Sequence, residues 1–169
     1  MNEKEFEFFL EKNQSRIYRL ALRIVENQEE ARDVTQETFL KAYQHRNRFR
    51  GEAKFSTYLY RIALNSAFTA LKKRYHHLPW EKMENLISTK KSPAGQLQEE
   101  ERAEMVRKTL ASLPEKQKAV IHLRIYEGMS FSEIATVLGC RPATARAHYF
   151  FGLQKIRKEM KKNYELPQV

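Results

Sequence analysis

Apolar residues recur at intervals of three and four along most of this 169-residue chain. This is the spacing of one face of an α-helix, and it predicts helices over about 3–26, over 28–44 and from a cap at Ser56 to about Arg74. Five Gly and five Pro are few for a small β-rich domain, which needs turn residues between its strands. The sequence therefore predicts an all-α fold.

The helical pattern is lost from His76 to about Gln96, where Pro79, Pro93 and Gly95 stand among scattered charges. Such a composition is typical of a flexible linker. A helical pattern resumes near Leu97, and Pro114 separates it from another helix over about 115–127. We therefore predict two small helical domains, 1–75 and 97–169, joined by a linker over 76–96.

The net charge of +10 is unevenly distributed. Residues 1–44 carry seven basic and nine acidic side chains, whereas residues 45–75 carry eight basic and one acidic. Residues 113–169 carry ten basic and five acidic side chains. Two basic blocks suggest two contacts with a nucleic acid. A solvated basic surface is the alternative.

The C-terminal part contains the pattern of a helix-turn-helix motif. Ser130 and Glu133 form a capping box, Gly139 suits a left-handed turn, and Pro142 suits the first turn of a second helix. The small Ala135 lets the two helices cross closely, and the apolar Ala145 falls at the offset that the motif requires. The second helix would present polar and basic side chains to the major groove of DNA: Arg141, Thr144, Arg146 and His148, with Lys155 and Arg157 further along. A plain helical hairpin remains the alternative.

The third predicted helix places Tyr58, Arg61, Asn65 and Lys72 on one face. An aromatic ring can stack on an unpaired base, Arg can neutralise a phosphate, and an amide can read a base edge. The alternative is that Tyr58 and the nearby Phe68 are packing residues of an ordinary amphipathic helix. The spacing does not decide between the two.

Other functional classes find little support in the sequence. No nucleophile elbow, phosphate-binding loop or H-E-x-x-H motif occurs, so we expect no enzyme activity. The single Cys140 and five scattered His favour neither a metal site nor any cofactor. No apolar run approaches the roughly 20 residues of a membrane span, and the acidic start is unlike a signal peptide. We expect a cytoplasmic protein without membrane insertion.

Three segments, taken together and in this order, resemble bacterial RNA polymerase sigma factors of the extracytoplasmic-function (ECF) type. They are QEEARDVTQETFLKAY (28–43), FSTYLYRIALNSAFTALKKR (55–74) and LPEKQKAVIHLRIYEGMSFSEIATVLGCRPATARAHYFFGLQKIRK (113–158). The resemblance implies a region-2 helical bundle and a region-4 helix-turn-helix domain joined by a linker. It also implies a function in promoter-specific initiation of transcription.

The resemblance assigns three sets of residues. Core polymerase would be bound by Asp33, Gln36, Glu37, Leu40 and Lys41. The melted minus-ten promoter element would be captured by Arg48, Arg50, Lys54, Tyr58, Arg61, Asn65, Lys72, Lys73 and Arg74. The minus-thirty-five element would be read by Arg141, Thr144, Arg146, His148, Lys155 and Arg157.

The partners implied by the resemblance are core RNA polymerase, through its beta-prime clamp helices and beta flap, promoter DNA, and an anti-sigma factor. Some positions depart from the family pattern: Tyr58 stands where Trp is most common, Thr69 where Asp is usual, and His148 and Phe151 where Arg is more common. One hypothesis is that Phe150 and Phe151 pack on another domain or on a regulator. A stand-alone helix-turn-helix regulator and a protein that only sequesters partners are the alternative functions.

Overall fold

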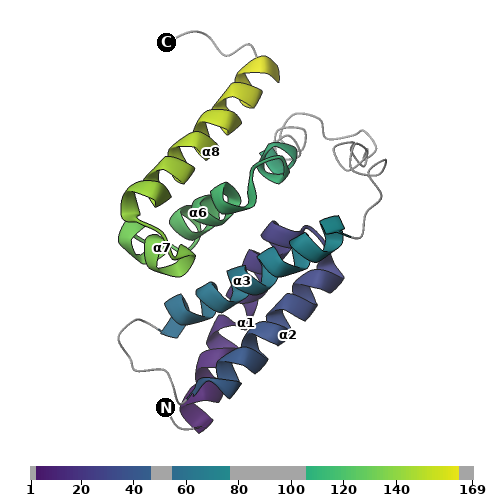
Figure 1. Cartoon of the computed structure of the whole chain (residues 1–169), viewed down its shortest axis with the longest axis vertical. Helices are drawn as coiled ribbons and strands as arrows, with labels where there is room; N and C mark the ends of the chain where they lie inside the picture. The colour runs from purple at the N-terminus through teal and green to yellow at the C-terminus, as the bar shows by residue number, and fades with distance from the viewer. Residues whose placement is uncertain (1–2, 47–54, 77–105, 164–169) are drawn as a thin grey trace.

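The computed structural model describes residues 3–46, 55–76 and 106–163, and all regular structure within these ranges is helical (Figure 1). This confirms the all-α prediction. The loop with Arg48, Arg50 and Lys54 lies outside the described residues, as does nearly all of the predicted linker. The domain limits at 75 and 97 therefore stay a prediction.

The N-terminal part is a bundle of three helices, α1 (Glu3–Val25), α2 (Gln28–Gln44) and α3 (Phe55–His76), as Figure 1 shows. α1 and α2 lie close to their predicted bounds. Glu26 adopts a left-handed conformation (φ 58°) in the turn between them, and the Asn27 side chain then caps α2 by accepting a hydrogen bond from the backbone N–H of Glu30 at 3.0 Å.

The start of α3 was predicted two residues too late, because a cap at Ser56 would make Thr57 the first helical residue. Ser56 is not its N-cap but lies inside the helix, which includes Phe55. The Phe55 ring is buried and packs edge-on against the ring of Phe6, with the centroids 5.8 Å apart. Burying a side chain of this size contributes roughly 2 kcal/mol, which favours continuing the helix through Phe55 over capping at Ser56.

The C-terminal part contains a helical segment at 106–111 and the helices α6 (Glu115–Ile125), α7 (Phe131–Leu138) and α8 (Pro142–Asn163). Both reciprocal hydrogen bonds of the Ser130–Glu133 capping box are present. Gly139 ends α7 in the left-handed conformation (φ 64°, ψ 40°), and α8 begins at Pro142. The predicted helix-turn-helix is therefore confirmed.

α8 crosses α6 closely at Gly152. A methyl group built on Gly152 would stand 2.7 Å from Cδ1 of Ile121, so a larger residue there would push against α6. Ala145 is fully buried closer to the start of α8. These two small residues bring the first half of α8 against the core and direct its opposite side to solvent.

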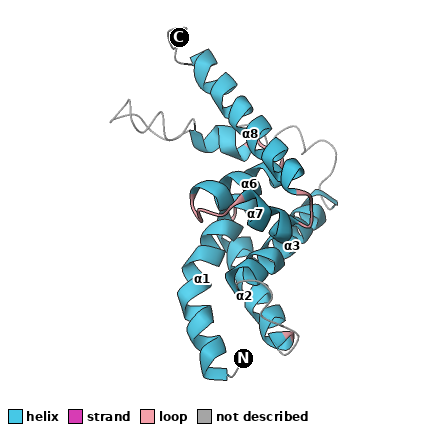
Figure 2. Cartoon of the chain, turned by 90° about the vertical axis from the view of Figure 1, so that its left-hand side faces the viewer, coloured by secondary structure: helices cyan, strands magenta, loops and turns pink. Residues whose placement is uncertain are grey.

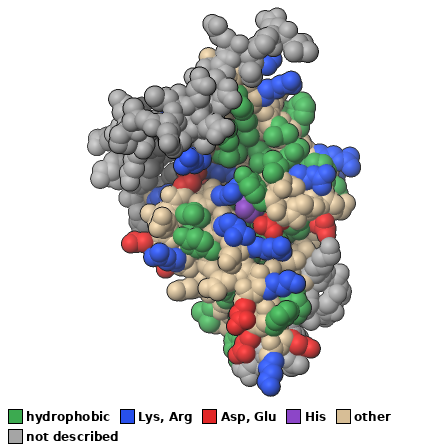
Figure 3. Space-filling model, turned by 180° about the vertical axis from the view of Figure 1, so that it is seen from behind, with side chains coloured by type: hydrophobic (Ala, Val, Ile, Leu, Met, Phe, Trp, Pro, Cys, Tyr) green, Lys and Arg blue, Asp and Glu red, His purple; other side chains and the backbone are tan. Residues whose placement is uncertain are grey.

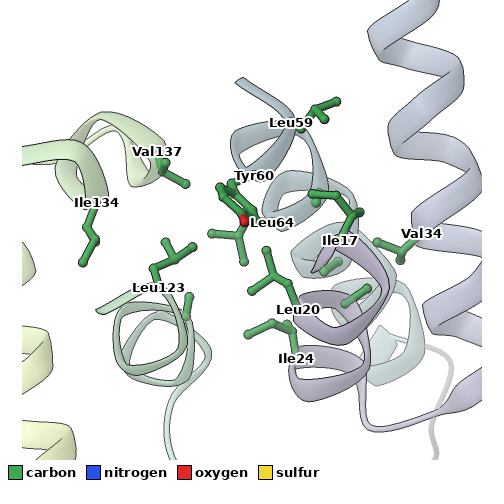
Figure 4. Packing of buried hydrophobic residues seen from close by; sticks show 14 of the residues in the cluster. Ile17, Leu20, Ile24, Val34, Leu59, Tyr60, Leu64, Leu123, Ile134 and Val137 are labelled. Atoms are coloured by element: carbon green, nitrogen blue, oxygen red, sulfur yellow. The ribbon is translucent and has the colours of Figure 1, made fainter. Parts of the chain in front are cut away.

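The two halves of the chain share one core. Tyr60 and Leu64 of α3 are buried on the side of that helix that faces the C-terminal part. Figure 4 shows them between Leu20 and Ile24 of α1 on one side and Leu123, Ile134 and Val137 of α6 and α7 on the other. In Figure 2, α6 and α7 lie between the N-terminal bundle and α8. The helix-turn-helix is thus docked on the N-terminal bundle.

Candidate nucleic-acid and partner interfaces

The outer face of α8 is the first candidate interface. Arg141, Thr144 and Arg146 are exposed at its N-terminal end, and Arg157 is exposed further along. His148 is half-buried. Lys155 is exposed but donates a hydrogen bond to the backbone carbonyl of Ser112 at 2.7 Å. A helix N-terminus with basic and hydroxyl side chains pointing to solvent has the chemistry that phosphates and base edges require.

This face also carries two large apolar side chains, which the sequence analysis did not assign to the DNA-reading set. Phe150 is 60% exposed and Phe151 is 54% exposed, and their rings meet edge to face with centroids 5.8 Å apart. They are not packed on the docked N-terminal bundle. The signal in the sequence was that both residues depart from the family pattern, Phe150 standing where a small polar residue is more common and Phe151 where Arg is more common.

The second candidate interface is a strip on α3, consisting of Tyr58, Arg61, Asn65 and Lys72. Arg61, Asn65 and Lys72 are exposed. Tyr58 is half-buried with its ring centroid 6.0 Å from that of Phe55, and this burial raises the pKa of its hydroxyl. The strip combines one aromatic ring, one amide and two cations, which suits an unpaired strand.

Arg74 differs from the other basic residues assigned to the minus-ten element. Its guanidinium donates to the backbone carbonyl of Val25 at 2.6 Å and to the Glu30 carboxylate at 2.5 Å. These contacts hold the end of α3 to the turn between α1 and α2. Lys72 and Lys73, in contrast, have exposed side chains. The structure therefore gives Arg74 a structural role within the bundle.

The third candidate interface is the solvent face of α2, with Asp33, Gln36, Glu37 and Leu40 exposed and Lys41 half-buried. Leu40 is 57% exposed. Lys41 pairs with Glu37 at 2.7 Å and donates to the Ser66 hydroxyl at 3.2 Å, and its hydrogen bond lowers the pKa of the Glu37 carboxyl. An exposed leucine beside an ordered ion pair is compatible with the apolar centre and polar rim of a protein interface.

A polar cluster joins the two halves of the chain. The Tyr60 hydroxyl of α3 donates to the Glu127 carboxylate at 2.5 Å, and the Arg16 guanidinium of α1 lies 3.8 Å from that carboxylate. The Glu127 side chain is only 7% exposed. Lys118 pairs with Glu26, and the guanidinium of Arg23 lies 3.6 Å above the Tyr126 ring. None of these contacts was predicted, because their members are far apart in the sequence.

His122 lies beside this cluster and is almost fully buried. Its Nε2 is 3.5 Å from the Glu127 carboxylate, but neither ring nitrogen has a hydrogen-bond partner within the described structure. Burial, with Arg23 and Arg19 nearby, lowers the pKa of the imidazole to about 4. His122 is therefore neutral at pH 7, and its contact with Glu127 is not an ion pair.

An apolar groove of about 950 Å³ opens beside this cluster. It is bounded by α1, α6, α8 and the segment 106–111, and its walls include Leu22, Ile125, Ile156 and Met160. Arg23, Arg107 and Lys118 also line it. In Figure 3, seen from behind, hydrophobic side chains gather in the upper half of the molecule with Lys and Arg around them.

The described residues contain no cluster of three or more His, Cys, Asp or Glu side chains arranged to hold a metal ion. Over the same residues, no helix combines the length and the apolar character that crossing a bilayer requires.

Comparison with known proteins gives matches along most of the chain. The family model described as Sigma-70 region 2 matches residues 9–76, and that described as Sigma-70, region 4 matches residues 103–156. The RNA polymerase sigma-H factor of Pseudomonas aeruginosa is 32% identical over 169 residues, which covers 94% of this chain and 88% of the relative. The ECF RNA polymerase sigma-E factor of Escherichia coli K12 is 32% identical over 159 residues, covering 88% of this chain and 83% of the relative.

Two solved structures share the fold. The sigma factor RpoE of Bartonella quintana, solved in complex with the anti-sigma factor NepR, superposes with a TM-score of 0.73 at 20% identity and covers 94% of this chain and 98% of its own. CnrH, solved in complex with the cytosolic domain of CnrY, superposes with a TM-score of 0.69 at 21% identity, covering 95% of this chain and 90% of its own.

Proposed function

This chain belongs to the ECF family of RNA polymerase sigma factors, and from this premise we propose that it binds core RNA polymerase and directs it to particular promoters. The observation that carries the proposal is the presence, in one chain, of a helix-turn-helix with an exposed basic second helix and an N-terminal bundle with two further exposed faces. A stand-alone regulator would need no face for polymerase.

The three surfaces have different roles in this proposal. The α8 outer face reads the minus-thirty-five duplex, with Arg141, Thr144 and Arg146 nearest the bases. The α3 strip captures minus-ten bases after they leave the stack, and stacking on Tyr58 offsets part of the unpairing cost of a few kcal/mol. Lys72 and Lys73 hold the phosphates of the captured strand.

The solvent face of α2 is the proposed contact with core polymerase. Leu40 supplies exposed apolar surface, and the Glu37–Lys41 pair presents charges whose positions are fixed before binding. Apolar surface that a partner can bury, bordered by charged groups, suits a protein interface with an apolar core and a polar rim. We propose the beta-prime clamp helices as the partner of this face, and the beta flap as the partner of the C-terminal domain.

An anti-sigma factor is the proposed inhibitor. RpoE was solved in complex with the anti-sigma factor NepR, and CnrH in complex with the cytosolic domain of CnrY. The chain itself contributes binding energy and no catalytic group, since nucleotide addition belongs to the polymerase. It acts with polymerase in the cytoplasm. Inhibition of its promoter-dependent transcription by one stoichiometric protein partner tests the anti-sigma proposal.

The direct test is run-off transcription from a genomic promoter library by core polymerase, with and without this protein. Promoter-specific transcripts that require the protein support the proposal. Leu40→Ala should lower the affinity for core at least tenfold, because a buried leucine at an interface contributes roughly 2 kcal/mol or more. Phe8→Ala, which removes a 60% exposed phenyl group from α1, is the control and should bind core normally. Binding of duplex operators without polymerase, and no effect on core, would contradict the proposal.

A further inference from the structure

The sides of α8 differ sharply in what they contact. Ala145, Tyr149, Gly152 and Ile156 are spaced by four, three and four residues and face the protein, where all are buried or half-buried. The opposite side carries Ala143, Ala147 and Gln154 with the pair Phe150–Phe151, all exposed. The side that a DNA groove would meet is therefore apolar at its centre.

The two phenyl rings form a single apolar ledge, because their edge-to-face contact holds one against the other. Exposed phenylalanines lose the free energy of burial, so a ledge of this kind in a soluble protein marks a contact surface. It stands between cations on the same helix, with Arg146 before it and Arg157 and Lys158 after it. A helix surface that is apolar in the middle and basic at both ends suits DNA, because phosphates border the base edges.

The position of the ledge along α8 also fits the major groove. Phe150 follows Pro142 by eight residues, which at 1.5 Å per residue places it about 12 Å into the helix. The major groove is about 12 Å wide and admits an α-helix, so a helix that lies in the groove can bring the ledge to the base edges. Arg157 and Lys158, a further two turns along, then lie near the backbone.

The apolar group that the major groove displays is the C5 methyl of thymine. We propose that Phe150 and Phe151 read thymine methyl groups in the minus-thirty-five element, and so make apolar contact a determinant of promoter choice in this protein. This inference rests on the proposed function, because it places α8 in that element. It replaces the hypothesis that the two rings pack on another domain.

The test uses holoenzyme and the promoter that gives the strongest run-off transcript. Each thymine of its minus-thirty-five duplex is replaced singly by deoxyuridine, which removes the methyl group and keeps base pairing. At one or two positions we expect the affinity of the wild-type holoenzyme to fall roughly fourfold, the loss that matches one buried methyl-sized group.

Phe150→Ala and Phe151→Ala should abolish this sensitivity, so that thymine and deoxyuridine promoters bind each variant within about 1.5-fold of one another. Phe8→Ala, with the same exposed fraction as Phe150, is the matched control and should keep the wild-type sensitivity. All three side chains are exposed, so the variants are expected to fold.

Three results would overturn the inference: no thymine in the minus-thirty-five duplex, no deoxyuridine effect on the wild type, or full sensitivity in both phenylalanine variants. A loss of affinity for a protein partner with unchanged methyl sensitivity also overturns it, because the ledge would then be a protein contact. Failure of the proposed function is distinguishable, since the wild type would then give no promoter-specific transcript at all.

Discussion

At the scale of single residues, the structure separates side chains that the sequence treats alike. Lys72, Lys73 and Arg74 form one basic run, yet only the lysines have exposed side chains, while Arg74 bonds to Val25 and Glu30. A run of cations in a sequence predicts a contact with phosphates, but it does not reveal which member is engaged within the fold. Which cation is engaged depends on the groups that the fold places beside it, and for Arg74 these lie at the turn between α1 and α2.

Arg74→Ala should lower the free energy of unfolding by about 2 kcal/mol, because it leaves the Val25 carbonyl and the Glu30 carboxylate without this donor. Lys72→Ala should change stability by less than about 0.5 kcal/mol and should instead reduce the salt dependence of promoter binding by about one ion. Urea unfolding and salt titration of holoenzyme on its promoter measure the two quantities. Equal effects of both variants on stability would contradict the assignment.

His122 should make stability depend on pH. Its pKa is lowered to about 4 in the folded chain from about 6.5 in the unfolded chain, so below pH 6.5 the unfolded chain binds the extra proton. The stability that the neutral imidazole provides is complete above pH 6.5 and is lost as the pH falls toward 4, by up to about 3 kcal/mol.

The variant His122→Leu isolates this effect from the titration of carboxyl groups, because leucine fills the site and binds no proton. Between pH 6.5 and 4, its unfolding free energy should fall less steeply than that of the wild type. Urea unfolding at half-unit pH steps provides the curves. Parallel curves would show that His122 takes up its proton equally in both states.

At the scale of elements, local patterns predicted the helices well. Residues close in the sequence determine where a helix begins and ends, and each amphipathic helix has one side toward solvent. This is why the sequence predicted the bounds of α1 and α2, the capping box of α7 and the start of α8 at Pro142. Burial of Tyr60 and Leu64 on a second side of α3 depends on contacts with α6 and α7, which no periodicity of α3 alone reveals. The exposure of most site residues on α2 and α8 was predicted for the same local reason, whereas Lys41 and His148 are half-buried.

The turn between α7 and α8 offers a clean test of this local control. A methyl group on Gly139 would meet nothing within 4 Å, so the cost of Gly139→Ala is that of the left-handed backbone alone, about 1 kcal/mol. Gly139→Asn should cost less, because asparagine tolerates this conformation better. Urea unfolding measures the loss of unfolding free energy in both variants. If alanine and asparagine were equally destabilising, a cause other than backbone conformation would be needed.

At the scale of the whole molecule, the docked arrangement is too short for both promoter elements. Two sites centred about 25 base pairs apart are separated by about 85 Å along B-DNA. A compact chain of this length has a radius of gyration near 15 Å. The 29 residues from 77 to 105 have a contour of up to about 100 Å, which is enough for the halves to part. Under the proposed function, the two halves therefore separate when both promoter elements are bound.

Glu127 should control this separation, because its buried carboxylate accepts from Tyr60 and faces Arg16 across the contact between the halves. Glu127→Ala leaves the Tyr60 hydroxyl without its acceptor, and the docked state should lose about 1–3 kcal/mol. The radius of gyration of the free protein, measured by small-angle X-ray scattering, should rise. Glu11→Ala, which removes an exposed carboxylate from α1, is the control and should leave the radius of gyration unchanged.

Opening should also change function in a defined direction. The apparent affinity for the promoter with core present is the intrinsic affinity multiplied by the fraction of molecules that are open. A variant that is open more often therefore needs less protein. Glu127→Ala should therefore reach half-maximal run-off transcription at a several-fold lower concentration than the wild type or Glu11→Ala. A larger radius of gyration without this gain would mean that docking does not oppose promoter binding. An unchanged radius would mean that the apolar contacts of Tyr60 and Leu64 hold the halves together without Glu127.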